Sequence, residues 1–193
     1  MEIKISPGNS KLGSIPNTSV IPVKDCGNCS SCKDSCYALK AWKQYPNVRE
    51  AWTNNSELWH NFPFKATDSV IRWFRKRKKP VPYFRIHVAG DFIGQNHLDM
   101  WIDIAKMFPE TQFKAFTKRF DLDYVYVPQN FNVGFSMWPG MPKPIKQTPS
   151  VVFAWVQDGT ETRIPSNAFR CLNDCSICKH CWESKTDVWF NQH

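Results

Sequence analysis

The sequence has no apolar run close to the roughly 20 residues that a helix needs to cross a bilayer. Its first residues, Met1–Pro7, also lack the apolar core of a signal peptide. We therefore expect a cytoplasmic protein with no membrane partner. The sequence also has no P-loop glycine pattern, no nucleophile elbow and no HExxH motif, so nothing in it supports a kinase or a hydrolase.

Cysteine is absent from residues 37–170, although the chain has eight cysteines. They form a first cysteine set (Cys26, Cys29, Cys32 and Cys36) and a second cysteine set (Cys171, Cys175, Cys178 and Cys181). A reducing cytosol disfavours disulfides, and gaps of two or three residues are too short for most disulfides within a set. Bridges between the two sets remain an alternative. The favoured interpretation is that each set gathers on a metal centre.

The spacing within each set favours iron–sulfur chemistry. The first set reads C-x2-C-x2-C-x3-C, the run of bacterial ferredoxins, with Tyr37 in place of the proline that usually follows. The second set has the same gaps in reverse order. We therefore predict one or two [4Fe-4S] clusters. Zinc is the alternative metal, although its sites usually separate two C-x2-C pairs by a dozen or more residues, and His180 could join a zinc shell.

The spacing does not determine which of the eight thiolates bind which cluster. Each set could hold its own cluster, or the two sets could exchange their fourth ligands as in two-cluster ferredoxins. A cluster held by three cysteines leaves one iron free for a substrate or cofactor, whereas four cysteines suit an electron carrier or a structural brace. The sequence therefore does not decide whether the protein is an enzyme.

Hydrophobic periodicity predicts an α/β fold with a mostly parallel sheet. Helices are expected over residues 37–46, from residue 47 onward, over 68–79 and around 98–108. Strands are expected over 81–88, 112–116, 132–135 and 150–156. Strands that alternate with helices are typical of a parallel sheet. We expect one domain over 1–193, with an arm and the first cysteine set in 1–36, an α/β core in 37–158, and the second set with a tail in 159–193.

Polar residues follow several of the expected strands, where the chemistry of parallel sheets gathers. They are Gly90 and Asp91, then Lys118 and Arg119, then Ser136. Arg85 and His87 lie two apart within a predicted strand and should therefore share one face of it. We predict that Arg85, His87, Lys118, Arg119 and Ser136 bind an anionic substrate. The alternative for Arg85 and His87 is a strand near the sheet edge with that face exposed to water.

The charge is strongly positive, with 25 Lys and Arg against 17 Asp and Glu. A formal net charge of +8 suggests an acidic partner, nucleic acid first and a host protein second. The alternative is a solvated basic face that keeps the protein in solution. In the basic stretch 72–79, we expect Trp73 and Phe74 to face the core while the charges face water.

Several segments resemble an uncharacterised family of phage gene products. They are residues 5–13, 36–41, 84–92, 116–119, 135–140 and 178–182, which read ISPGNSKLG, CYALKA, FRIHVAGDF, FTKR, FSMWPG and CKHCW. The likeness extends over nearly the whole chain. It implies a phage or prophage origin, and hence the cytoplasm of the host cell, without an established activity.

A more distant resemblance is to radical S-adenosylmethionine proteins, which are partial (β/α) barrels. The shared order is a cysteine cluster that ends at Cys36-Tyr37, then helices, then a strand that ends at Ala89-Gly90-Asp91. The resemblance implies an open or partial barrel, a [4Fe-4S] cluster, and cofactor binding at Gly90 and Asp91. The family's C-x3-C-x2-C spacing occurs here only in the second set. The hypotheses are thus a radical-S-adenosylmethionine-like enzyme acting on nucleic acid or a nucleotide, a non-catalytic iron–sulfur protein, and a zinc-stabilised nucleic-acid-binding module.

Overall fold

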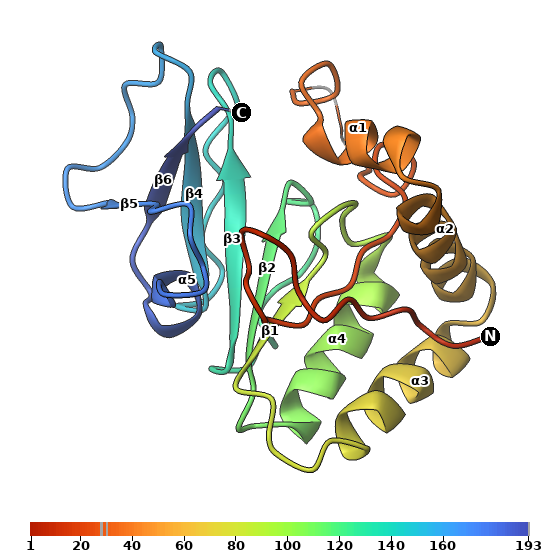
Figure 1. Ribbon diagram of the computed structural model, residues 1–193. Coiled ribbons are helices and arrows are strands. Elements are labelled where there is room, and N and C mark those ends of the chain that lie inside the picture. The colour runs from red at the N-terminus through yellow and green to blue at the C-terminus, as the bar shows by residue number, and fades with distance from the viewer. Residues whose placement is uncertain (28, 30, 193) are drawn as a thin grey trace.

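The computed structural model describes residues 1–27, 29 and 31–192 and contains a sheet of six parallel strands (Figure 1). The order of the strands in the sheet is β1-β2-β3-β4-β6-β5. The strands are β1 (Tyr83–Ile86), β2 (Gln112–Thr117), β3 (Phe131–Met137), β4 (Val151–Gln157), β5 (Phe169–Arg170) and β6 (Val188–Asn191). They form an open half-barrel, which confirms the predicted α/β fold class and mostly parallel sheet.

Five helices accompany the described strands. They are α1 (Tyr37–Gln44), α2 (Pro46–Asn61), α3 (Pro63–Arg75), α4 (Gln95–Met107) and α5 (His180–Glu183). Pro46 and Pro63 each stand at the start of their helix, where the missing N–H costs nothing because the first turn has no acceptor for it. The helix predicted over 68–79 was wrong at both ends, since α3 begins at Pro63 and ends at Arg75.

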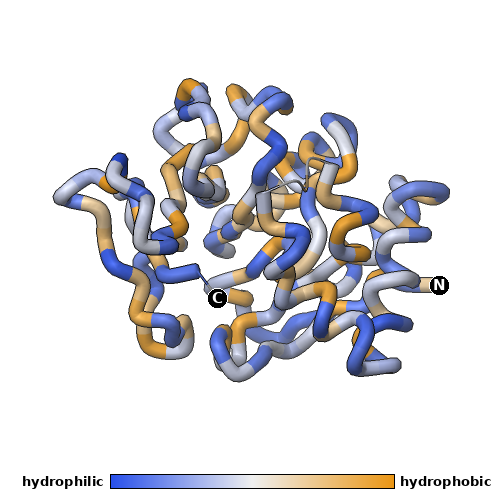
Figure 2. Tube along the Cα trace, turned by 90° about the horizontal axis from the view of Figure 1, so that it is seen from above, coloured by the Kyte–Doolittle hydropathy of each residue, from blue (hydrophilic) through white to orange (hydrophobic). Residues whose placement is uncertain are grey.

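The main core lies between the sheet and the two helices α3 and α4. Phe84 of β1 and Phe113 of β2 are fully buried and contact Phe74 of α3, with ring centroids 5.2 and 5.6 Å apart. Trp101 of α4 packs on Phe84 at 5.8 Å. Hydrophobic and hydrophilic residues alternate along the helices in Figure 2, as expected of helices that bury one face. The face of the sheet turned toward α3 and α4 is called the outer face below.

The opposite face of the sheet, called the inner face, is covered by the end of the chain. Trp182 of α5 is 2% exposed and donates its indole N–H to the carbonyl of Phe84 at 3.2 Å. Leu12 and Ile15 of the arm pack against the same ring. Asn132 of β3 donates to the carbonyl of Cys181 at 3.3 Å. The tail therefore folds back into the half-barrel and carries the second cysteine set with it.

The sheet extends beyond the segment 37–158 that was predicted as the core. Strand β6 pairs with β4 from Ala154 to Gln157, and β5 pairs with β6, so the segment expected to be a tail supplies two strands. The arm also joins the sheet, through a parallel bridge between Asn17 and Arg85. Within the described residues, no helix is both long enough and apolar enough to cross a membrane.

Candidate metal centre

The arm delivers the first cysteine set to the carboxyl edge of the sheet. The N–H of Arg85 donates to Pro16, Val88 donates to Thr18, and the N–H of Val20 donates to Ala89, at 3.0 to 3.1 Å. Asn55 of α2, which is fully buried, holds the other side of the arm by donating to the carbonyls of Lys4 and Ser19. These bonds run the arm parallel to β1, so the cysteine loop begins where the sheet ends.

Gly90 lets the arm and the loop after β1 approach closely. Its φ of +76° lies in the left-handed region that favours glycine. A Cβ at this position would stand 2.3 Å from Cγ2 of Val20 and 3.1 Å from the Val20 carbonyl oxygen. The next residue, Asp91, donates its N–H to the carbonyl of Asp25 at 3.1 Å. The two predicted cofactor-binding residues, Gly90 and Asp91, therefore lie directly against the start of the cysteine loop.

The thiols of the first cysteine set are neighbours of one another. Burial raises the pKa of Cys26 to about 12, with a further contribution from Cys29. Burial also raises the pKa of Cys29, and the neighbouring thiols of Cys32 and Cys36 raise it further. The Cys29 thiol is within hydrogen-bonding reach of Cys26 and Cys32. Cys36 caps α1, since its Sγ accepts from the N–H of Leu39 at 3.4 Å. The loop and the first turn of α1 thus bring this set together.

The second cysteine set gathers in the same way beneath the arm. The N–H of Cys175 donates to the carbonyl of Lys11 at 2.8 Å, which fixes the loop to the arm. Burial raises the pKa of Cys181, and the thiols of Cys171 and Cys178 add to that rise. Cys175 and Cys181 also pack against the apolar cluster around Trp182. This set is therefore part of the packing on the inner face.

All eight cysteines are free thiols and partly buried. Among the residues that the structure describes, no three or more His, Cys, Asp or Glu side chains converge closely enough to hold a single metal ion. The members of each set are therefore near neighbours that do not meet at one point.

Asp91 ties together the ends of two strands. Its carboxylate accepts the N–H of Phe92 at 2.7 Å and the N–H of Lys118 at 2.8 Å. It is 4% exposed, and burial raises its pKa to about 6, although these hydrogen bonds act to lower the pKa. Burial alone would lower the pKa of Lys118, but Cys32 and Asp91 raise it above its usual value. Lys118 thus lies between the first cysteine set and a buried carboxyl group.

The prediction that Arg85 and His87 share one face was wrong. Strand β1 ends at Ile86, and His87 has a φ of +53°, which breaks the alternation of side chains. The His87 ring lies on the outer side, 5.0 Å from the ring of His97 in α4. It is 2% exposed, neither ring nitrogen has a hydrogen-bond partner among the described residues, and burial lowers its pKa to about 3. The His87 ring therefore lies in the core, on the face of the sheet opposite the Arg85 side chain.

Two other predicted substrate-binding residues lie in different settings. Arg119 donates to the carbonyls of Phe92 and Ile93 at 2.8 and 3.0 Å and forms an ion pair with Asp121. Its guanidinium thus braces the loop after β1. Ser136 of β3 is 8% exposed and lies on the inner face, two residues beyond Gly134.

Lys114 is a buried cation that was not among the residues predicted from the sequence. It lies on the inner face of β2, opposite Arg85 in the register of the two strands, and it is fully buried. Its Nζ is 4.5 Å from the centroid of the Phe116 ring, and the Arg85 guanidinium is 4.3 Å from the same centroid. A Cβ on Gly134 would come within 2.4 Å of that ring and 3.1 Å of Nζ, so glycine makes the room. A lysine in the middle of an otherwise apolar strand was the available signal.

The basic stretch behaves as expected. Phe74 is buried and Trp73 packs on the core, whereas residues 75–79 are exposed. Arg72 pairs with Asp68, and the Arg77 guanidinium lies 4.2 Å from the centroid of the Trp73 ring. The exposed cations form a small basic surface at the end of α3. Nucleic acid or a host protein as its partner stays a prediction.

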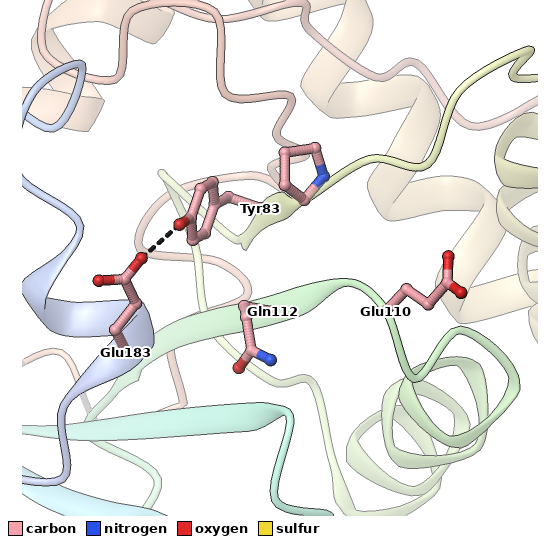
Figure 3. A pocket seen from close by; sticks show the side chains of 5 residues that line it. Tyr83, Glu110, Gln112 and Glu183 are labelled. Atoms are coloured by element: carbon pink, nitrogen blue, oxygen red, sulfur yellow. Dashed lines mark hydrogen bonds between the residues drawn. The ribbon is translucent and has the colours of Figure 1, made fainter.

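A shallow cavity of about 370 Å³ opens at the amino ends of β1 and β2 (Figure 3). It is lined by Pro82, Tyr83, Glu110, Gln112 and Glu183. The hydroxyl of Tyr83 donates to Glu183, which joins β1 to α5. None of the predicted site residues lines this cavity. It lies at the end of the strands opposite to the first cysteine set.

Comparisons with known proteins place the chain among phage proteins. The family model described as Gene product 88 matches residues 4–183. The Gene 88 protein of Mycobacterium phage D29 is 27% identical over 122 residues, which cover 58% of this chain and 50% of that protein. The chain therefore spans about half the length of this curated relative. No solved structure matches.

Proposed function

We propose that this chain, which belongs to the Gene product 88 family of phage proteins, is an iron–sulfur protein whose two cysteine sets each hold a [4Fe-4S] cluster. The observation that carries the proposal is the grouping of the thiols. Cys29 has Cys26, Cys32 and Cys36 as its neighbours, and Cys181 has Cys171 and Cys178. Thiolates are soft ligands that select iron–sulfur centres, zinc or copper(I).

The spacing of the thiols supports a cluster over zinc. A structural zinc ion draws four ligands into one tetrahedron, with each sulfur about 2.3 Å from the metal. A cubane cluster accepts its thiolates at four separate iron corners, so its ligands stand farther apart. Four cysteines within eleven residues at each end of the chain suit these separated corners better than the two distant pairs of a structural zinc site.

Anaerobic purification followed by metal analysis tests this proposal. We expect a brown protein with about eight irons and a similar amount of acid-labile sulfide per chain, as two cubane clusters require. Visible absorption should bleach on reduction with dithionite. A colourless protein that holds stoichiometric zinc, with neither iron nor sulfide, would instead support the zinc-stabilised module.

A second candidate is an enzyme that uses S-adenosylmethionine. The observation in its favour is that the arm runs parallel to β1 and leads into the first cysteine set beside Gly90 and Asp91. In such an enzyme three thiolates of the first set would hold the cluster and leave one iron for the cofactor. Gly90 and Asp91 would then lie beside the cofactor, while Lys118 and Ser136 would contact the substrate.

Spectroscopy separates this enzyme from the non-catalytic protein. The test is to add S-adenosylmethionine to the reduced protein and record its electron paramagnetic resonance spectrum. If the protein is such an enzyme, the signal of the first cluster should change and the signal of the second cluster should not. Variants in which the four cysteines of one set are replaced by serine show which signal belongs to which cluster. An unchanged spectrum at saturating cofactor contradicts the enzyme and leaves the iron–sulfur proposal in place.

A further inference from the structure

We infer that Lys114 and Arg85 form a cationic pair that compensates the negative charge of the second cluster, and that this cluster is therefore reduced before the first. The inference rests on the proposed function, because it presumes that both cysteine sets hold clusters. It assigns a role to Lys114, which lies outside both cysteine sets, and a new one to Arg85.

Lys114 has the setting of a cation that awaits an anion. It is fully buried, and its Nζ has no hydrogen-bond partner among the described residues. Burying an ammonium group without a partner costs several kcal/mol, so such a group is retained where a negative charge compensates it. Burial lowers the pKa of Lys114 to about 7, and the group that opposes this effect is Cys181 of the second cysteine set. The Nζ of Lys114 lies 4.5 Å from the centroid of the Phe116 ring.

Arg85 adds a second cation at the same place. It is opposite Lys114 in the register of β1 and β2, and the two side chains share the Phe116 ring. Cys175 and Cys181 are among the groups that act on its guanidinium. Two like charges on directly opposed strand positions repel each other. A cluster with thiolate ligands beside both of them relieves that repulsion, because it adds negative charge between them and the tail.

The first cysteine set has a different electrostatic environment. Lys118 acts on Cys32 and Cys26. Arg119 also lies against Gly27, but its guanidinium is paired with Asp121. The carboxyl group of Asp91 lies against Lys118 and against Cys26, so it offsets much of that positive charge. Lys118, whose N–H donates to the Asp91 carboxylate, thus faces the first set, whereas Lys114 and Arg85 face the second. No carboxyl group is among those that act on Lys114 in the part of the chain that the structure describes, and Asp91 acts on Arg85 less than Cys175 and Cys181 do.

This difference predicts the order of reduction. Adding one electron to a cluster makes it more negative, and nearby positive charge stabilises that reduced form. The second cluster should therefore have the higher reduction potential. When dithionite supplies one electron per protein, the electron should reside on the second cluster, and the first should be reduced only at lower potential.

A redox titration monitored by electron paramagnetic resonance tests the inference on the intact protein. Serine variants of each cysteine set assign the two signals. In Lys114→Met, we expect the equilibrium for reducing the second cluster to fall at least about tenfold, which is about 59 mV for a one-electron couple. The first cluster should be unchanged. Lys114→Arg keeps the charge and should keep the potential, and Arg85→Met should shift the second cluster in the same direction as Lys114→Met.

The outcomes separate the inference from the proposed function. Absence of iron and sulfide from the parent protein would contradict the proposed function itself. Iron-loaded protein in which the first cluster is reduced first would overturn the inference alone, as would unchanged potentials in Lys114→Met and Arg85→Met. If Lys114→Met fails to fold, Arg85→Met decides, because this partly buried side chain can lose its charge at a smaller packing cost. A Lys118→Met variant serves as the matched control and should shift only the first cluster.

Discussion

Replacing the four cysteines of the second set with serine should remove half of the iron and also loosen the end of the sheet. The reason is that Cys175 and Cys181 pack with Leu12, Ile15 and Trp182 on the inner face. A centre bound there contributes its binding free energy to folding. We expect the free energy of unfolding to fall by on the order of 3 kcal/mol or more. The measurements are iron per chain and denaturant unfolding followed by tryptophan fluorescence.

The same replacement in the first set is the matched control. It changes the same number of residues and should also remove half of the iron. The first set lies in the loop before α1, where Cys36 caps the helix, and its thiols belong to neither apolar cluster among the residues that the structure describes. This variant also loses the binding free energy of its centre, but little packing, so we expect a smaller loss of stability than in the second set, of which the weaker cap contributes about 1 kcal/mol. Equal losses of stability in the two variants, or iron content that stays at the parent level, would contradict this assignment.

Periodicity predicted most of the elements because their burial follows the repeat of a helix or strand. The helix around 98–108 has Leu98, Trp101 and Ala105 on one face, and all three are fully buried in α4. The strand over 112–116 became β2 with one additional residue. These segments are each amphipathic or apolar by themselves, so local sequence is sufficient to identify them.

The parts that could not be predicted depend on long-range contacts. The positive φ of His87 turns its ring to the opposite face, and nothing in the local alternation signals that turn. Strand β6 is short and gains its partner only because the tail returns to β4. The arm reads as a loop, and it pairs with β1 because Asn55, some 36 residues farther on, binds the carbonyl of Ser19. Such pairings are set by tertiary packing, which overrides local preference.

The sequence predicts the candidate ligands, which remain a prediction, but it did not indicate the charged residues around them. Cysteine spacing is a direct signal, since the ligands of one centre must be close in sequence when they share one loop. The role of Lys114 depends on its position opposite Arg85 across two strands. The sequence contains both residues but gives no register between the strands. Only the folded sheet places them together beside the second set.

Stability should fall steeply as the pH drops below about 6.5, because two histidines are buried in their neutral form. Burial lowers the pKa of His87 to about 3, with Arg85 adding to the effect, and it lowers the pKa of His97 well below its usual 6.5. His87 and His60 also disfavour the charged form of His97. The unfolded chain therefore binds more protons than the native protein below about pH 6.5. Stability is fully present above that pH and is lost as the pH falls toward the native values.

The size of the effect follows from the number of protons. Two histidines that charge only on unfolding lower the free energy of unfolding by about 2.7 kcal/mol per pH unit below their unfolded pKa. Asp91 acts in the opposite direction, because its raised native pKa of about 6 means that the folded protein takes up this proton first. Between about pH 6 and the usual aspartate value near 3.8, the net slope should be close to one proton, or about 1.4 kcal/mol per unit.

Urea unfolding of the parent protein and of a His87→Asn, His97→Asn double variant at a series of pH values measures this slope. The double variant cannot take up the two protons, so its stability should stop falling with acidity and rise slightly through Asp91. Both proteins carry the same cysteine sets, so the acid sensitivity of the metal centres cancels in the comparison. Asp91→Asn in the parent background should steepen the slope toward two protons per unit. Parallel curves for the parent and the double variant would show that the buried imidazoles do not govern the acid limit of this fold.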